Sequence, residues 1–212
     1  MNDQNESEKI MTLHEFDMQY YRQYPLLCGT DEAGRGPLAG DVFAAAVILA
    51  PDTVIEGIND SKKLTAKKRD KLFDEIKEKA LYWAIERCTV AEIEEMNILN
   101  AAMLAMKRSV EALGVTPDMV LADGNKLPPV ECPVQFVIKG DAKSQSVAAA
   151  SVLAKVARDR YMEEMSEKYP QYAFEKHKGY GTKLHYQMLD KYGASEIHRQ
   201  SFLKKYYAAK QQ

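Results

Sequence analysis

The chain has 212 residues, of which 46% are hydrophobic, and its 29 Lys and Arg against 31 Asp and Glu give a formal net charge of −2. This length and composition predict one globular domain with a sizeable core. The longest apolar run, residues 42–50, is too short to cross a membrane, and the acidic N-terminus is not typical of a signal peptide. The three widely spaced cysteines exclude a disulfide framework. We therefore expect a cytoplasmic protein with no membrane partner, and the near-neutral charge taken alone disfavours a nucleic-acid partner.

The first half of the chain predicts a hairpin, a helix and a strand. Residues 1–24 are expected to form an N-terminal extension ahead of a main domain over 25–212. Two apolar runs, 26–30 and 42–49, flank a Gly- and Pro-rich stretch, which is typical of a hairpin. Helical spacing over 65–80 and apolar–polar alternation over 82–90 predict a helix and then a half-buried strand.

The second half alternates helical and strand-like patterns. Residues 91–113 have a helical period with a break near Asn97, and 119–122 and 135–138 resemble short strands. A long Ala-rich helix over 146–169 and a shorter one over 182–192 follow. This order predicts an α/β fold, a mixed sheet with helices packed on it, and a helical C-terminal segment from about 145 to 212.

Acidic residues follow several of these predicted strands. Asp31 and Glu32 come after the first, Asp123 after another, and Asp141 after the last. Ligands of sheet proteins collect beyond strand ends, and converging carboxylates repel each other unless a cation holds them. Mg²⁺ prefers such oxygen ligands, and two ions about 4 Å apart suit phosphoryl chemistry. Taken singly, Asp123 also fits a turn and Asp141 a helix cap, but neither role explains the whole set.

Three other segments carry Gly, basic or aromatic residues. Gly34, Arg35 and Gly36 offer close backbone approach and a planar donor fork, although a tight turn with a solvated Arg has the same composition. Ser61 and Lys62 lie at a loop-to-helix junction that suits either an anion or an ordinary basic helix start.

The stretch 176–186 packs basic, aromatic and Gly residues into a predicted loop suited to a sugar beside a phosphate. We interpret His177, His185 and His198 as loop or phosphate-contact residues rather than metal ligands.

Several motifs, in order from about residue 26 to 203, resemble bacterial ribonuclease HII. The most specific is the decapeptide from Asp31 to Gly40 (DEAGRGPLAG). The others are DSKKL at 60–64, Asp123-Gly124, KGDAK at 139–143 with the Ala-rich helix, GYGT at 179–182 and HRQSF at 198–202.

The resemblance implies a ribonuclease H-like fold with a five-stranded mixed sheet. It also implies hydrolysis of RNA within RNA–DNA hybrids and incision 5′ to ribonucleotides in duplex DNA, leaving 5′-phosphate and 3′-hydroxyl ends. The metal-binding acids fall on Asp31, Glu32, Asp123 and Asp141, with two Mg²⁺ or Mn²⁺ ions expected. Substrate-binding positions fall on Gly34, Arg35, Gly36, Ser61, Lys62, Lys143 and Tyr180.

Some relatives have Pro at the position of Gly181, and the adjacent Tyr180 is retained here. Asp159 is the rival fourth acid, but its place inside a predicted helix favours an ion pair.

The resemblance and the residues also bear on partners. A non-catalytic nucleic-acid-binding module and a junction resolvase are the alternatives; the four acids disfavour the first, and the Gly-Arg-Gly loop with Tyr180 disfavours the second. We expect a monomer, and a DNA sliding clamp is a possible partner that no residue supports. Residues 139–212 hold 14 Lys and Arg against 8 Asp and Glu, so the near-neutral total conceals a basic segment suited to a phosphate backbone.

Overall fold

The computed structural model describes residues 11–210, and a five-stranded mixed sheet lies at its centre. The strands are β1 (Leu27–Ala33), β2 (Val42–Ile48), β3 (Tyr82–Cys88), β4 (Met119–Asp123) and β5 (Val134–Val137). Their order across the sheet is β3-β2-β1-β4-β5. The pairs β1–β2 and β2–β3 are antiparallel, whereas β1–β4 and β4–β5 are parallel. The predicted α/β fold and the hairpin of β1 and β2 are confirmed.

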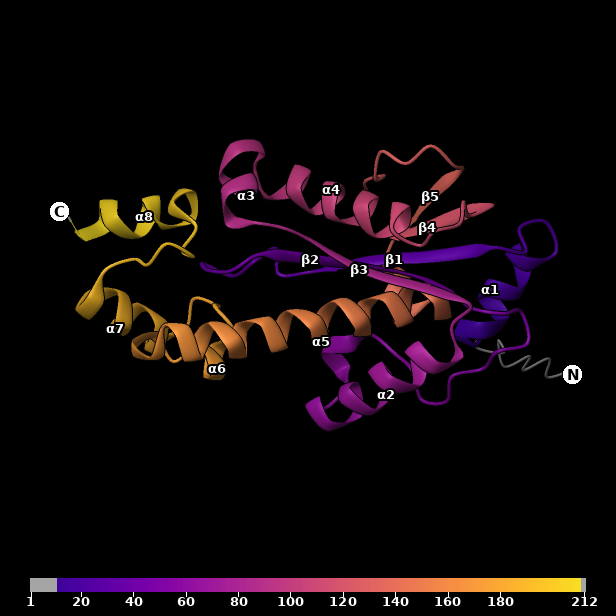
Figure 1. Cartoon of the computed structure of the whole chain (residues 1–212), viewed down its shortest axis with the longest axis horizontal. Helices are drawn as coiled ribbons and strands as arrows, with labels where there is room; N and C mark the ends of the chain where they lie inside the picture. The colour runs from indigo at the N-terminus through magenta and orange to yellow at the C-terminus, as the bar shows by residue number, and fades with distance from the viewer. Residues whose placement is uncertain (1–10, 211–212) are drawn as a thin grey trace, which may run out of the picture.

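Helices cover both faces of this sheet (Figure 1). One face packs against α4 and the other against α5, with α2 on the outer side of α5. The helices are α1 (Leu13–Tyr21), α2 (Ala66–Lys79), α3 (Val90–Met96), α4 (Ile98–Glu111), α5 (Gln145–Lys168), α6 (Phe174–His177), α7 (Lys183–Tyr192) and α8 (Gln200–Lys210). Three 3-10 turns, η1 (Ser61–Lys63), η2 (Gly140–Ala142) and η3 (Pro170–Tyr172), join them. Within residues 11–210, no helix has both the length and the apolar character to cross a membrane.

The N-terminal part of α5 lies directly against β1. A Cβ atom at Gly29 would lie only 2.1 Å from the carbonyl carbon of Ser146, so only glycine permits this approach. The Ala-rich sequence of α5 serves the same contact, because Ala148, Ala149 and Ala150 are fully buried with small side chains. This close packing fixes the beginning of α5, and the residues just before it, beside the carboxyl end of β1.

The predicted break near Asn97 separates α3 from α4. Asn97 has φ 71° and ψ 161°, a non-helical conformation, and its side-chain oxygen accepts hydrogen bonds from the N–H groups of Leu99 and Asn100. It therefore ends one helix and caps the next.

Within the predicted extension, α1 packs against β1 and α5. Asp17 is fully buried, and its Oδ2 accepts hydrogen bonds from the N–H and hydroxyl of Ser146. Residues 1–10 of that extension lie outside the described residues.

Beyond the sheet, α6 packs on the C-terminal part of α5, and α7 and α8 lie at the same end of the molecule, where they pack together through Leu189 and Leu203 (Figure 1). The helix α8 lies within the predicted helical C-terminal segment, although the sequence pattern did not delimit it as a separate helix. The stretch 176–186 is not one loop: α6 ends at His177 and α7 begins at Lys183, which leaves only 178–182 between them.

Candidate active site

Three carboxylates from separate elements converge where β1 and β4 end. Asp31 lies in β1 and Asp123 is the last residue of β4. These strands pair in parallel with Thr30 opposite Ala122, so their carboxyl ends lie side by side. Asp141 lies in η2, and one oxygen of each of the three carboxylates is within 4.8 Å of the other two. The structure thus brings together three of the four acids expected to bind metal.

A tight turn after β5 delivers Asp141 to this cluster. Lys139 adopts a left-handed conformation with φ 57°, and the N–H of Gly140 donates to Asp123 Oδ1 at 2.6 Å. The residue that caps α5 is Ser144, whose hydroxyl accepts from the N–H of Val147. Asp141 is therefore free of the capping role that its sequence position also suited.

Glu32 lies next to the cluster but outside its tightest part. Adjacent residues of a strand point to opposite faces, so Glu32 diverges from Asp31. Its Oε1 pairs with Arg35 Nη1 at 3.2 Å, and its side chain is largely buried. Both acids nevertheless border one hollow of about 830 Å³, the carboxylate hollow, whose lining includes Asp31, Glu32, Gly34, Arg35, Gly36, Ser61, Lys62, Lys155, Arg158 and Tyr180.

Burial and mutual repulsion disfavour the charged forms of these acids. Burial, followed by the charges of Glu32 and Asp123, raises the pKa of Asp31 well above its usual range. Burial and then Asp123 raise the pKa of Asp141 to about 6. Burial also raises the pKa of Glu32, against the opposing effect of Arg35. A close group of carboxylate oxygens with raised pKa values fits a hard divalent cation such as Mg²⁺ or Mn²⁺, whose charge would offset the repulsion.

Lys62 brings a positive charge to the same acids. Although burial alone lowers the pKa of Lys62, the charges of Asp31 and Asp141 raise it above its usual value. Lys62 lies in η1, and its N–H is capped by Asp60 Oδ1 at 2.9 Å. It borders both the carboxylate hollow and a second hollow of about 530 Å³ that reaches Asp123 and Asp141.

The turn η1 is held in place from α5 and α2. The hydroxyls of Ser61 and Ser151 form a buried hydrogen bond of 2.8 Å. Arg69 of α2 donates to the carbonyls of Ser61 and Leu64 and lies 3.9 Å from Asp159.

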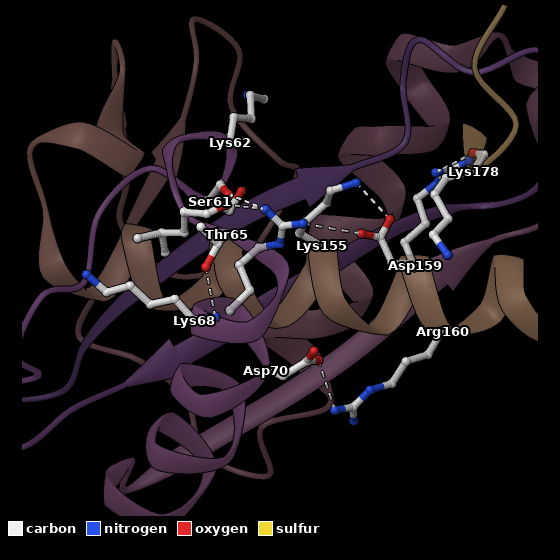
Figure 2. A network of polar contacts seen from close by, with 12 residues as sticks. Ser61, Lys62, Thr65, Lys68, Asp70, Lys155, Asp159, Arg160 and Lys178 are labelled. Atoms are coloured by element: carbon white, nitrogen blue, oxygen red, sulfur yellow. Dashed lines mark hydrogen bonds and ion pairs between the residues drawn. The ribbon is translucent and has the colours of Figure 1, made fainter. Parts of the chain in front are cut away.

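Figure 2 shows Asp159 paired with Lys155 on α5, while Lys62 points away from both. The expectation that Asp159 is an ion-pair residue is therefore confirmed.

The loop that follows Glu32 packs on buried arginines. Gly34 has φ +104°, and a Cβ there would lie 2.1 Å from Arg158 Nε, so both its conformation and its contact require glycine. Arg158 is fully buried and donates to the carbonyls of Ala39, Asp41 and Lys178. This guanidinium joins the loop after β1 to the segment after α6.

Arg199 is a functional candidate that sequence reasoning did not assign, although it lies within the HRQSF motif. It is fully buried and donates to four carbonyls of the loop after β1. The acceptors, at 2.7–3.1 Å, belong to Gly34, Arg35, Pro37 and Gly40. The backbone of Gly34–Gly36 is thus held by one buried side chain, that of Arg199, while the Arg35 side chain is half exposed.

Tyr180 lies beside this loop. It is 42% exposed, and a Cβ at Gly36 would lie 3.7 Å from its ring. The Arg158 guanidinium and the Lys155 ammonium are each 5.9 Å from its centroid. The structure therefore brings Tyr180 together with Gly34, Arg35 and Gly36, whereas Lys143 is exposed just before α5 and lines neither hollow.

His177 and His185 lie in α6 and α7, and His198 lies in the segment before α8. All three rings are buried, so the prediction that they contact phosphate is wrong, and only His198 is the loop residue that was expected. Their exposed fractions are only 7%, 0% and 1%. They pack on one another and on Phe174, with the rings of His177 and His185 stacked at 4.3 Å. For His185 and His198, the covering rings of Phe174 and Tyr172 come from α6 and η3, which are distant in the sequence, so a local pattern does not show this burial.

Comparisons with known proteins agree with these features. Residues 28–205 match the family model described as Ribonuclease HII. Ribonuclease HII of Idiomarina loihiensis is 61% identical over 177 residues, which cover 84% of this chain and 95% of that protein. The enzyme of the same name from Caldicellulosiruptor bescii is 57% identical and covers 85% of this chain and 88% of its own. The crystal structure of ribonuclease H2 from Pyrococcus horikoshii superposes with a TM-score of 0.69 at 27% identity, over 82% of this chain and 92% of that one.

Proposed function

The chain belongs to the ribonuclease HII family of hydrolases, with ribonuclease H activity on RNA–DNA substrates, and we propose that it also incises duplex DNA 5′ to embedded ribonucleotides. The observation that carries this proposal is the convergence of Asp31, Asp123 and Asp141 within 4.8 Å. Asp31 lines the carboxylate hollow together with the Gly34–Gly36 loop and Tyr180, and Asp123 and Asp141 line the second hollow, which shares Lys62 with the first. Metal-ligating oxygens and a sugar-reading surface therefore lie close enough to act on one nucleotide.

The four carboxylates of Asp31, Glu32, Asp123 and Asp141 would hold two Mg²⁺ or Mn²⁺ ions. Such a pair supplies an activated water and charge stabilisation for both oxygens of an in-line phosphodiester displacement, which leaves 5′-phosphate and 3′-hydroxyl ends. Asp31 is fixed within the sheet and Asp141 by the packing of α5 on Gly29, so the ligands are positioned before substrate binds.

The cationic side of the hollow suits the phosphate chain. Lys62 faces the acids and offers a mobile charge to the scissile phosphate, and Ser61 lies beside it. Lys143 is exposed before α5 and would contact only more distant phosphates.

Selectivity for RNA must come from groups near the 2′-hydroxyl, because that hydroxyl is the local difference between the two sugars. The backbone of Gly34 and Gly36 permits such an approach, since neither residue carries a side chain, and Arg35 adds donors. The exposed ring of Tyr180 lies against Gly36 and would pack on the sugar that follows the ribonucleotide. A monomeric state and a sliding-clamp partner stay predictions.

The direct test is cleavage of duplex DNA that carries one ribonucleotide, in Mg²⁺ or Mn²⁺, with an all-DNA duplex of the same sequence as control. We expect a single cut on the 5′ side of the ribonucleotide and an intact control. Equal cutting of both duplexes, or cutting of neither while an RNA–DNA hybrid is degraded, would overturn the proposed ribonucleotide incision. EDTA should stop all cleavage.

A further inference from the structure

The three buried histidines lie directly behind Tyr180, and the proposed chemistry makes no use of them. His177 ends α6, His185 lies in α7, and His198 precedes α8. Every ring nitrogen of His177, His185 and His198 has a hydrogen-bond partner within the protein. Because backbone N–H groups can only donate and carbonyls can only accept, these partners determine the tautomer of each ring.

The donor and acceptor of each hydrogen bond can be assigned in turn, beginning with His198. The backbone N–H of Ser195 donates to His198 Nδ1 at 2.9 Å, so this nitrogen carries a lone pair and the proton is on Nε2. His198 Nε2 lies 3.0 Å from His185 Nε2. His198 is therefore the donor of this contact, and His185 Nε2 is the acceptor.

The ring of His185 in turn donates a hydrogen bond to Tyr180. Since His185 Nε2 accepts, the proton of this neutral ring must be on Nδ1. His185 Nδ1 is 3.0 Å from the carbonyl oxygen of Tyr180, which accepts it. A directed relay thus runs from the Ser195 N–H through His198 and His185 to the Tyr180 carbonyl.

His177 supports the same segment from the other side. The N–H of Gly179 donates to His177 Nδ1 at 3.2 Å, so His177 Nε2 carries the proton that Tyr172 accepts through its carbonyl at 2.9 Å. The ring of His177 stacks on that of His185 at 4.3 Å. Gly179 is therefore bonded to the ring of His177 and Tyr180 to the ring of His185, and these two rings stack on each other.

The relay is attached at its origin to the loop after β1. Around His198, the N–H of Arg199 donates to the carbonyl of Leu38, and the N–H of Gly40 donates to the carbonyl of Ile197, both at 2.8 Å. The N–H of Leu38 in turn donates to the carbonyl of Gly179 at 2.8 Å. The backbone that carries Gly34–Gly36 and the backbone that carries Tyr180 are thus joined directly, and each is also bonded to the segment that contains His198 or to its relay.

We propose that His185, oriented by His198, is a positioning residue for Tyr180: its Nδ1–H fixes the Tyr180 carbonyl and so sets the tyrosine ring against the Gly34–Gly36 loop. The consequence for specificity rests on the proposed function, in which Tyr180 contacts the sugar after the ribonucleotide. The relay itself rests only on the geometry. Burial, opposed by the bond to Tyr180, lowers the pKa of His185 to about 4, so the ring is neutral at neutral pH as the relay requires.

The tautomers give a test that does not depend on activity. Long-range ¹H–¹⁵N correlation spectra of the full chain, labelled at histidine nitrogens and recorded near neutral pH, distinguish the two neutral forms and the cation. We expect His185 as the Nδ1–H form and His198 and His177 as Nε2–H forms. An Nε2–H or a charged His185 would overturn the relay, whatever the enzyme cleaves.

Two substitutions of His185 separate the two ends of the relay. Glutamine places its amide near Nε2 and keeps a partner for His198, but it loses the donor to Tyr180. Asparagine places its amide near Nδ1 and keeps that donor. We expect His185→Gln to lower kcat/KM on single-ribonucleotide DNA about three- to tenfold and His185→Asn to stay within about twofold of the wild type.

The same pair in a Tyr180→Ala background tests whether His185 acts through the tyrosine ring. With no ring to position, both double variants should match Tyr180→Ala within about twofold. An equal fall for His185→Gln in both backgrounds, at unchanged thermal unfolding, would overturn the positioning role. If the wild type does not cleave this substrate, the proposed function fails, and the tautomer spectra still decide the relay.

Discussion

The carboxylate cluster and the arginine and histidine region lie on either side of the Gly34–Gly36 loop, but the two regions accommodate buried polar groups differently. In the cluster, Asp31 and Asp141 have raised pKa values because burial and neighbouring acids oppose their charge. In the other region, Arg199 donates to four carbonyls, and every ring nitrogen of the three histidines has a hydrogen-bond partner within the protein. The first region is organised for a cation that the protein does not itself provide, whereas the second is satisfied within the fold.

This difference predicts that substitutions in the two regions separate activity from stability. Removing a charge from the cluster relieves repulsion and removes one of the proposed metal ligands. Removing a donor from the second region leaves buried carbonyls without partners, which costs stability first and affects cleavage through the loop that they form.

The largest effect is expected for Asp31→Asn. Loss of this ligand should lower the cleavage rate at least about a thousandfold. Since the pKa of Asp31 is raised in the folded protein, the same change should raise the thermal midpoint of the metal-free protein. Cleavage assays and thermal melts in EDTA measure both quantities. A variant that is both inactive and less stable would contradict the proposed contrast between the regions.

Arg199→Met tests the opposite side of the comparison. The carbonyls of Gly34 and Gly40 lose buried donors, and we expect a loss of about 2–4 kcal/mol in the free energy of unfolding. Arg35→Met is the matched control, because the Arg35 side chain is half exposed, and its stability should change by no more than about 0.5 kcal/mol. Urea denaturation compares the two, and equal losses would show that Arg199 is not the support of the loop.

A smaller effect on cleavage is expected for Lys62, whose charge lies near the acids and would also lie near the substrate. Lys62→Met should lower kcat/KM about tenfold, because the Lys62 ammonium faces Asp31 and Asp141. Lys143→Met should stay within about twofold, since Lys143 lines neither hollow. Steady-state cleavage of an RNA–DNA hybrid compares the two variants. A larger loss for Lys143→Met than for Lys62→Met would show that the phosphate contact lies at the beginning of α5 instead.

The smallest net effect is expected for the change of stability with pH, because the acids of one region and the histidines of the other change the free energy of unfolding in opposite directions as pH rises. The folded pKa of Asp141 is raised to about 6, so its contribution to the stability of the metal-free protein is lost as pH rises from about 4 to 6. Burial lowers the pKa of His185 and of His198 to about 4, so their contribution is lost as pH falls from about 6.5 to 4.

Thermal melts in EDTA across pH 4 to 7 check these signs. Asp141→Asn should become more stable with rising pH more steeply than the wild type does. A shallower slope in Asp141→Asn would show that repulsion at this carboxylate is not what opposes folding.

The sequence was most informative where a local pattern carries the structure. The hairpin of β1 and β2, the break at Asn97 and the acids at strand ends follow from periodicity, turn chemistry and position, and the structure has all three. The convergence of Asp31 with Asp123 also follows from topology, because neighbouring parallel strands end at the same edge.

Local patterns fail where burial is created by distant segments. His198 is polar in sequence, yet it is covered by Tyr172 and Phe174 from η3 and α6. Arg199 looks like a surface cation until the loop after β1, more than 150 residues earlier, supplies its acceptors. Such residues were visible only as parts of a motif, without a physical role that the local sequence could assign.

The proposed function requires that the carboxylate cluster hold the divalent ions used in cleavage. The most direct measurement is a Mn²⁺ titration of the wild type, Asp31→Asn and Asp159→Asn, with the thermal midpoint and the cleavage rate of single-ribonucleotide DNA read from the same samples. We predict that both quantities rise together in the wild type and in Asp159→Asn, whose carboxylate only pairs with Lys155 and Arg69, and that neither rises in Asp31→Asn. A metal-dependent rise of both in Asp31→Asn, equal to that of the wild type, would contradict the account.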